Sequence, residues 1–136
     1  MAPAVRPPLR LLRVANPVVR AVLGSPAHRL LSDRLLVLDY RGRRTGRGHR
    51  IPLRYAQTET GDLVAVAVHP ARKQWWRSFA EPSAATVLLR GASVDVVGAL
   101  TSGGRRATAL ARYDARNPRG ARWTRDAAVV VFTLSR

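Results

Sequence analysis

The chain has 136 residues, enough for one domain around a single core, and its formal net charge of +16 comes from 24 Lys and Arg against 8 Asp and Glu. It has no cysteine and only three widely separated histidines, which excludes disulfides and thiolate chemistry and argues against a zinc or iron site. A hydrophobic content of 46%, with no apolar run near the roughly 18 residues that cross a bilayer, predicts a folded cytoplasmic protein.

Residues 1–33 carry the signals of a tail followed by two short helices. Asn16-Pro17 is typical of a helix start and Gly24 of its end, while Ser25-Pro26 repeats the start signal. The first 32 residues hold five arginines and no acid, so these helices either pack on the rest of the protein or touch a membrane surface peripherally. We expect residues 34–136 to form the cofactor-binding domain proper.

Residues 41–54 form a glycine-punctuated segment with six arginines and no acid. Apolar residues flank it at Leu35–Leu38 and at alternate positions of Ile51–Tyr55, which predicts a loop between two strands. Because both the Rossmann fingerprint and the Walker loop must open a helix, neither applies. Three glycines that can expose amide groups, together with guanidinium forks, predict an anion-binding turn; a solvated hairpin tip is the alternative.

The rest of the chain predicts further short strands and two helices. A polar turn at Thr58–Asp62 predicts an antiparallel hairpin between the strand at 51–55 and a strand at Leu63–Val68. Ala71–Phe79 predicts a helix with one aromatic face, and a second helix follows at about 104–113. The remaining strands are expected at 85–89, 93–100 and 127–134. Six strands with few helices predict a mainly β (α+β) fold, namely a small, closed or nearly closed antiparallel barrel.

Candidate ligand contacts cluster after the third expected strand. Trp75 and Trp76, next to Arg72 and Lys73, are suited to stacking on a heteroaromatic ring while the cations hold an acidic group; core packing is the alternative. His69 follows an apolar strand, so its imidazole is placed to hydrogen-bond the edge of such a ring or simply to end the strand.

Tyr113 and Trp123 flank the last loop and are candidates for the mouth of a substrate pocket. The eight acids are scattered, so the sequence shows neither a hydrolytic triad nor paired carboxylates, and no catalytic residue is assigned. A bound cofactor would then carry the chemistry on a small-molecule substrate. Binding of nucleic acid or anionic lipid is supported by charge alone, because no zinc finger, RRM signature or helix-turn-helix is present.

Three motifs resemble one family, the deazaflavin-dependent nitroreductases. Gly42-Arg43-Arg44-Thr45-Gly46, six residues before Pro52-Leu53, is similar to the family's basic turn leading into a Pro-Leu strand. Trp75-Trp76 followed by Phe79 and Pro82 is similar to its tryptophan-tyrosine helix, and Trp123-Thr124-Arg125 to its C-terminal segment. The resemblance is strongest over residues 35–82 and implies a six-stranded split β-barrel.

The resemblance also implies a function, which is hydride transfer from reduced coenzyme F420 to a quinone, nitroaromatic or activated alkene. It implies that Arg43, Arg44, Thr45 and Gly46 contact the phosphate or glutamate tail, with Pro52 close to the bound coenzyme. FMN is the less favoured cofactor. Val68-His69-Pro70-Ala71 stands where the family commonly has Ser-Lys-Gly-Gly. This difference motivates an alternative, a non-catalytic carrier of deazaflavin, flavin or haem.

Overall fold

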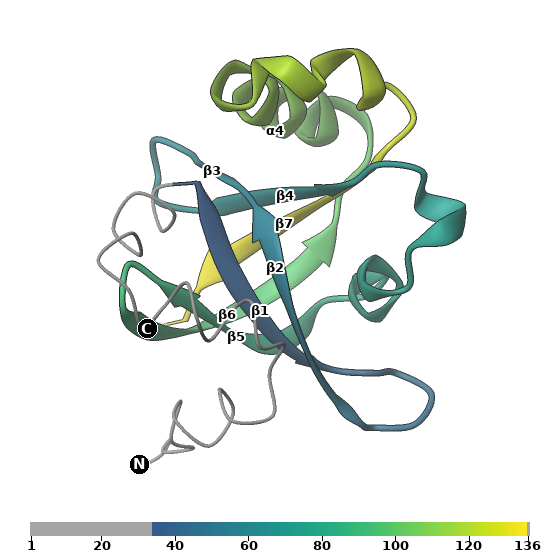
Figure 1. Ribbon diagram of the computed structural model, residues 1–136, viewed down its shortest axis with the longest axis vertical. Helices are drawn as coiled ribbons and strands as arrows, with labels where there is room; N and C mark the ends of the chain where they lie inside the picture. The colour runs from purple at the N-terminus through teal and green to yellow at the C-terminus, as the bar shows by residue number, and fades with distance from the viewer. Residues whose placement is uncertain (1–33, 136) are drawn as a thin grey trace.

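The computed structural model describes residues 34–135, and the helices expected within residues 1–33 lie outside that range. Seven antiparallel strands of the described chain form one sheet (Figure 1): β1 Leu35–Arg41, β2 Gly48–Arg54, β3 Ala56–Gln57, β4 Leu63–Ala67, β5 Ser83–Leu89, β6 Ala92–Leu100 and β7 Ala128–Leu134. Helical segments complete the fold: the 3₁₀ turns η2 Pro70–Arg72, η3 Trp75–Phe79 and η4 Pro118–Trp123, and the α-helix α4 Gly103–Arg116. No helix in this range is long and apolar enough to span a bilayer.

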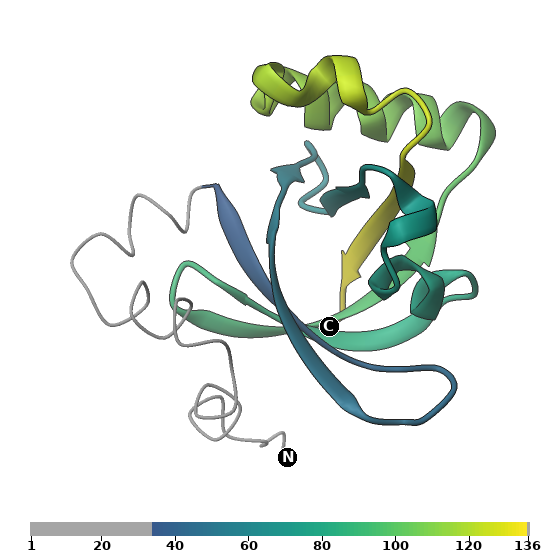
Figure 2. The ribbon, with the colours of Figure 1, turned by 45° about the vertical axis from the view of Figure 1, so that its right-hand side comes forward.

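The sheet is curled into a half-barrel, as Figure 2 shows. Its strand order is β2-β1-β5-β6-β7-β4-β3, so the two outer strands, β2 and β3, are separated in the chain by Tyr55 alone. The chain therefore leaves one border of the sheet and enters the other within a single residue. This connection brings the two borders together and makes the curled shape a consequence of the topology.

The expected mainly β architecture is confirmed, but the strand count of six is wrong. The strand expected at 51–55 is the last part of β2, which ends at Arg54, and the short strand β3 follows after Tyr55. β2 pairs with β1 from Leu35↔Arg54 to Arg41↔Gly48, and of these two strands β3 alone pairs with β4. The expected hairpin between 51–55 and 63–68 is thus reduced to the short β3–β4 pair, because β2 is already committed to β1.

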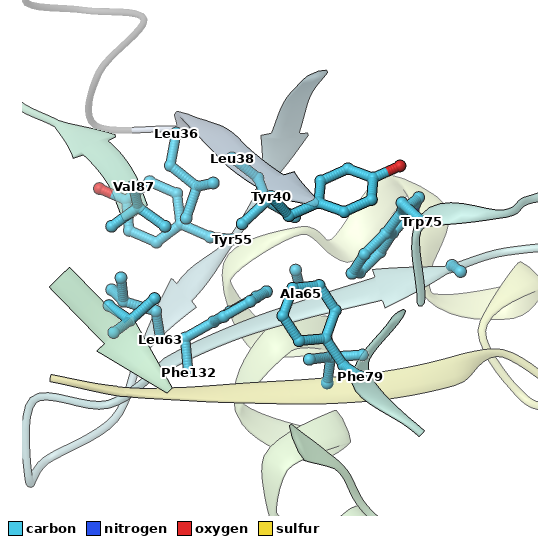
Figure 3. Packing of buried hydrophobic residues seen from close by; sticks show 13 residues of the cluster. Leu36, Leu38, Tyr40, Tyr55, Leu63, Ala65, Trp75, Phe79, Val87 and Phe132 are labelled. Atoms are coloured by element: carbon cyan, nitrogen blue, oxygen red, sulfur yellow. The ribbon is translucent and has the colours of Figure 1, made fainter. Parts of the chain in front are cut away.

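The interior of the half-barrel is filled by aromatic and branched side chains (Figure 3). Phe79 and Phe132 are fully buried, with ring centroids 5.2 Å apart in an edge-to-face arrangement. A Cβ atom at Gly98 would lie 2.7 Å from both rings, so this strand position must be glycine for the two rings to pack. β4 contributes residues to two layers: Leu63 faces this interior, while the alternate residue Val64 packs beneath α4.

The expected helix at 71–79 is wrong, because the segment forms two 3₁₀ turns instead. Lys73 has an extended backbone, with φ −107° and ψ 144°, and separates η2 from η3. Trp75 and Phe79 enter the core, whereas Trp76 is half-buried and its indole N–H donates to the Pro70 carbonyl at 2.9 Å. The aromatic residues therefore divide between interior and surface and do not share one helical face.

Other expected elements are confirmed with small shifts in their bounds. The β5–β6 hairpin turns at Arg90 and Gly91, whose φ values of 50° and 81° are those of a tight two-residue turn. The predicted helix at 104–113 is present as the longer α4. The predicted strand at 127–134 is present as β7, which lies between β6 and β4 in the sheet.

Candidate ligand-binding cleft

The arginine-rich turn is the tip of the β1–β2 hairpin, and its amides bond within the turn. The Gly42 amide donates to the Arg47 carbonyl and the Gly46 amide to the Gly42 carbonyl, each at 2.8 Å. The Arg47 amide donates to the Thr45 hydroxyl at 3.2 Å. Of the turn's glycines only Gly46 has a positive φ, at 70°. The expected cradle of free amides at Gly42 and Gly46 is therefore wrong, since these groups are already satisfied.

The side chains of Arg43 and Arg44 are exposed at this tip. The base of the hairpin is anchored to the core, because the ring of Tyr40 stacks on His49 with centroids 5.2 Å apart and lies 6.0 Å from Phe79. Arg41 is directed back onto the turn, where its Nη1 donates to the Gly46 carbonyl at 3.0 Å. The tip is thus an ordered, convex, cationic projection.

A cleft of about 490 Å³ lies near the other end of β2. Its walls come from β2, the β4–η2 junction, α4 and η4, and they consist of Arg54, Val68, His69, Tyr113, Asn117, Arg119, Gly120 and Trp123. Three residues singled out in the sequence, His69, Tyr113 and Trp123, therefore line one cavity. Arg54, Asn117 and Arg119 had not been assigned to a site, because nothing in their local sequence shows that they meet here.

His69 and Trp123 form one wall of this cleft. The imidazole and indole centroids are 6.4 Å apart, with the ring planes inclined at 48°. His69 has φ 56° and ψ 62°, a left-handed conformation that costs a non-glycine residue about 1 kcal/mol. Trp123 is 55% exposed, and the Arg122 guanidinium lies 5.1 Å from its ring centroid. The wall thus presents a solvent-accessible indole with a guanidinium over its ring and an imidazole nearby.

Tyr113 and Asn117 form the floor of the cleft at the C-terminal end of α4. Asn117 is buried, and its side-chain amide donates to the Tyr113 carbonyl at 3.0 Å and to the Tyr55 carbonyl at 3.4 Å. Burial raises the pKa of Tyr113 above its ordinary value of 10.0; the nearby Arg54 charge opposes that rise and Asp114 adds to it. Tyr113 is therefore a neutral phenol at physiological pH.

Thr124, which the sequence reading did not single out as a site residue, holds η4 against α4. Its hydroxyl is buried, 2.9 Å from Oδ1 of Asp114 and 2.8 Å from the Ala121 carbonyl. These contacts fix the segment that carries Trp123. The signal available in the sequence was its place in Trp123-Thr124-Arg125, directly after the candidate aromatic residue.

A second cleft of about 520 Å³ adjoins the first and shares Arg54, Asn117 and Arg119 with it. We call its four cationic residues the arginine basin: Arg34, Arg54, Arg116 and Arg119. Among the described residues that line this cleft, none is Asp or Glu. Its remaining walls are Tyr55, Asn117 and Pro118.

The other candidate contacts do not line either cleft. Trp75 is only 6% exposed and packs in the core, so its ring is not available as a stacking surface. Trp76 is half-buried, with the Arg77 guanidinium 5.2 Å from its ring centroid. Arg72, Lys73 and Pro52 are exposed, the last on the outer strand β2.

No protein-family model matches this sequence, and no curated protein matches it. Solved structures do share its fold. They include an F420-H2 dependent reductase, FDR-A, with a TM-score of 0.59 and 14% identity over 75% of this chain and 94% of that one. They also include HutZ, the haem storage protein of Vibrio cholerae, with a TM-score of 0.58 and 14% identity over 82% of this chain and 90% of that one.

A third similar structure is Atu2129, a protein of unknown function from Agrobacterium tumefaciens str. C58. The TM-score is 0.58 and the identity 16%, and the match covers 88% of this chain but only 59% of that one. At these identities the likeness establishes the fold and not the activity. The chain therefore has a half-barrel fold that also occurs in an F420-dependent reductase and in a haem storage protein.

Proposed function

We propose that the protein is a deazaflavin-dependent oxidoreductase that transfers hydride from reduced coenzyme F420 to a quinone, nitroaromatic or activated alkene. The observation that supports this most is the cleft in which His69, Tyr113 and Trp123 meet beside Arg54 and Arg119. An aromatic face suits a planar ring, and adjacent guanidinium groups suit the phosphate and carboxylates of the same coenzyme.

The cleft fits such a ligand in size and chemistry. Its volume of about 490 Å³ lies within the usual range of cofactor pockets, and Val68 and Gly120 give it an apolar share. The bound coenzyme would supply the hydride, while the protein binds it, orients it and excludes water. Trp123 would stack on the ring, and the neutral phenol of Tyr113 would offer a hydrogen-bond donor at the floor.

The family resemblance assigns the acidic tail to Arg43, Arg44, Thr45 and Gly46, with Pro52 nearby. With a strand rise of about 3.4 Å per residue, Gly48 at the base of the hairpin tip lies about 20 Å along β2 from Arg54. Cleft and tip are therefore separate candidate sites for the acidic arm, and the proposed function holds with the arm at either one. Arg72, Lys73 and Trp76, on the η2–η3 segment, complete the set of proposed contacts. Trp75 would act from the core, by supporting this segment.

Fluorescence titration with oxidised F420, run beside FMN as competitor, tests cofactor binding. We expect F420 to bind more tightly than FMN, because the larger number of negative charges on its arm matches the cationic surface. Turnover of reduced F420 with menadione as acceptor then tests catalysis. Absence of binding to either chromophore would reject the proposed function.

One observation favours a second candidate, a haem or flavin carrier. His69 is exposed beside the indole of Trp123, so its imidazole would bind the iron of a haem while the indole packs on the macrocycle. A carrier would bind its ligand without oxidising or reducing it. Haemin titration of the protein and of His69→Ala distinguishes the two: a Soret shift that requires His69, without F420 turnover, would favour the carrier.

A further inference from the structure

We infer that the arginine basin is an anion-binding site, and that it holds the phosphate-bearing arm of the planar ligand whose ring lies against Trp123. The inference rests on the proposed function for the identity of that ligand. It differs from the family resemblance, which assigns the arm to Arg43 and Arg44 at the hairpin tip.

Continuity of the two clefts is the first argument. They share Arg54, Asn117 and Arg119, so a ligand with its ring at Trp123 can extend into the basin without leaving the protein surface. The shared wall is well fixed, because Asn117 is buried and bonded to the carbonyls of Tyr55 and Tyr113. Tyr55 itself is only 3% exposed. Tyr55 and Asn117 therefore give the basin a fixed wall, around which its four exposed arginines are placed.

Charge is the second argument. Arg34, Arg54, Arg116 and Arg119 bring four positive charges to a cleft whose described lining contains no carboxylate. The C-terminal end of α4, close to Arg116, contributes only about half a negative charge through the helix dipole. A strongly positive, concave site remains, and concave walls strengthen attraction to an anion because they exclude part of the solvent.

The hairpin tip is a weaker anion-binding site than the basin, although it is equally rich in arginine. Arg43 and Arg44 are exposed on a turn that lines neither cleft, and water screens a charge pair there to roughly 1 kcal/mol or less. The basin arginines are exposed too, but they surround a cleft of about 520 Å³. The amides of Gly42 and Gly46 bond within the turn. The tip therefore attracts anions over a distance, whereas the basin can enclose a phosphate or a pair of carboxylates.

A matched pair of double variants tests the inference. Arg54→Gln/Arg119→Gln removes two charges from the basin, and Arg43→Gln/Arg44→Gln removes two from the tip. Three probes are titrated into each: F420, the same deazaflavin chromophore without its phosphate-bearing arm, and inorganic tripolyphosphate. Fluorescence gives the dissociation constants for the chromophores, and the rise in the midpoint of thermal unfolding reports binding of tripolyphosphate.

We expect the basin variant to bind F420 at least about tenfold more weakly, with a shallower salt dependence, because two charge-assisted contacts are lost. Binding of the armless chromophore should be unchanged in the tip variant, and should fall less than F420 binding in the basin variant, because Arg54 and Arg119 also border the ring cleft. The tip variant should bind F420 within about twofold of wild type. The reverse pattern, with the large loss in the tip variant, would overturn the inference.

The titration with tripolyphosphate separates this inference from the proposed function. If wild type binds neither chromophore, but tripolyphosphate raises its thermal midpoint and not that of the basin variant, the anion site stands and the proposed function fails. If F420 binds wild type and basin variant equally, the inference fails and the proposed function stands. Sub-micromolar binding of duplex DNA at physiological salt that depends on Arg54 and Arg119 would also overturn it, since the basin would then serve a polymer.

Discussion

The hairpin tip and the arginine basin carry the same side chain in opposite surroundings. The tip gathers its arginines from one short stretch of sequence and presents them on a convex turn whose amides are already bonded. The basin gathers its arginines from positions as far apart as Arg34 and Arg119 and sets them around a cavity with buried Tyr55 and Asn117 in its wall. A high local density of arginine therefore indicates positive charge but not a binding site. A binding site also needs the walls of a cavity, and here segments far apart in the sequence supply them.

Two tryptophans differ in exposure in a similar way. Trp75 stands beside cationic residues in the sequence, yet it is 6% exposed and fills the core. Trp123 also follows a cationic residue, Arg122, at the end of η4, yet it is 55% exposed beside His69. Neighbours in the sequence therefore predict poorly which indole is open to a ligand.

The largest expected effect is a loss of stability from the aromatic packing that supports the base of the β1–β2 hairpin. Phe79 is fully buried and its ring meets those of Tyr40, Trp75 and Phe132. Phe79→Ala should lower the free energy of unfolding by about 3–5 kcal/mol, because it removes a large core ring and leaves a cavity. Urea denaturation measures the loss. Hydrogen-exchange protection should fall more in β1 than in α4, because α4 packs on a separate cluster. An equal fall in both elements would contradict a local support role for Phe79.

Trp123→Ala should weaken chromophore binding about tenfold, since stacking on one exposed indole contributes about 1–3 kcal/mol. Stability should change by no more than about 0.5 kcal/mol, because the side chain is largely exposed. Val97→Ala is the control, a truncation of an exposed apolar side chain on β6 that lines neither cleft. Fluorescence titration of the armless chromophore measures the effect, and equal weakening by both variants would place the ring elsewhere.

The turn geometry of the tip gives a smaller prediction. Gly46→Ala should destabilise the protein by about 1 kcal/mol, because Gly46 has φ 70° and an alanine there is strained. Gly48→Ala is the control in the same segment: a Cβ there meets nothing within 4 Å and no left-handed φ is required. Thermal unfolding compares the two. Neither change should alter binding in the cleft. A loss of F420 affinity in Gly46→Ala would indicate that the tip, and not the basin, holds the phosphate-bearing arm.

The smallest effect concerns two of the buried phenols, Tyr40 at the base of the hairpin and Tyr113 at the cleft. Burial raises the pKa of both Tyr40 and Tyr113 above 10.0. Their contribution to stability is therefore complete below pH 10 and is lost as the pH rises through their folded-state pKa. Arg54→Gln should raise the pKa of Tyr113 further, because the Arg54 charge lowers it, and should leave Tyr40 unchanged. Tyrosinate absorbance, assigned with Tyr40→Phe and Tyr113→Phe, measures both.

Much of the fold followed from the sequence, because alternation and turn residues are local signals. The β5–β6 hairpin, α4 and β7 lie close to their expected positions. The break at Tyr55 was missed, because the alternation at 51–55 gives no sign that β2 pairs with β1 while β3 pairs with β4. The helix at 71–79 was missed for a similar reason: its aromatic spacing fits a helix, but Trp75 and Phe79 reach the core from a 3₁₀ turn.

The cleft was predictable only in part. His69, Tyr113 and Trp123 attracted notice because each is an aromatic or titratable residue next to a strand or loop. Arg54 and Arg119 could not be told from the other arginines of a chain with a net charge of +16. Their shared location depends on where β2 ends relative to η4, which is a property of the folded chain alone.

The single-residue link at Tyr55 has a mechanical consequence. Where the two borders of the curled sheet meet, the seam between β2 and β3 is a peptide connection rather than a ladder of hydrogen bonds. Such a seam cannot slip in register. Arg54 immediately precedes it, so the position of this arginine between the two cavities is set by the covalent chain and by buried Tyr55 next to it.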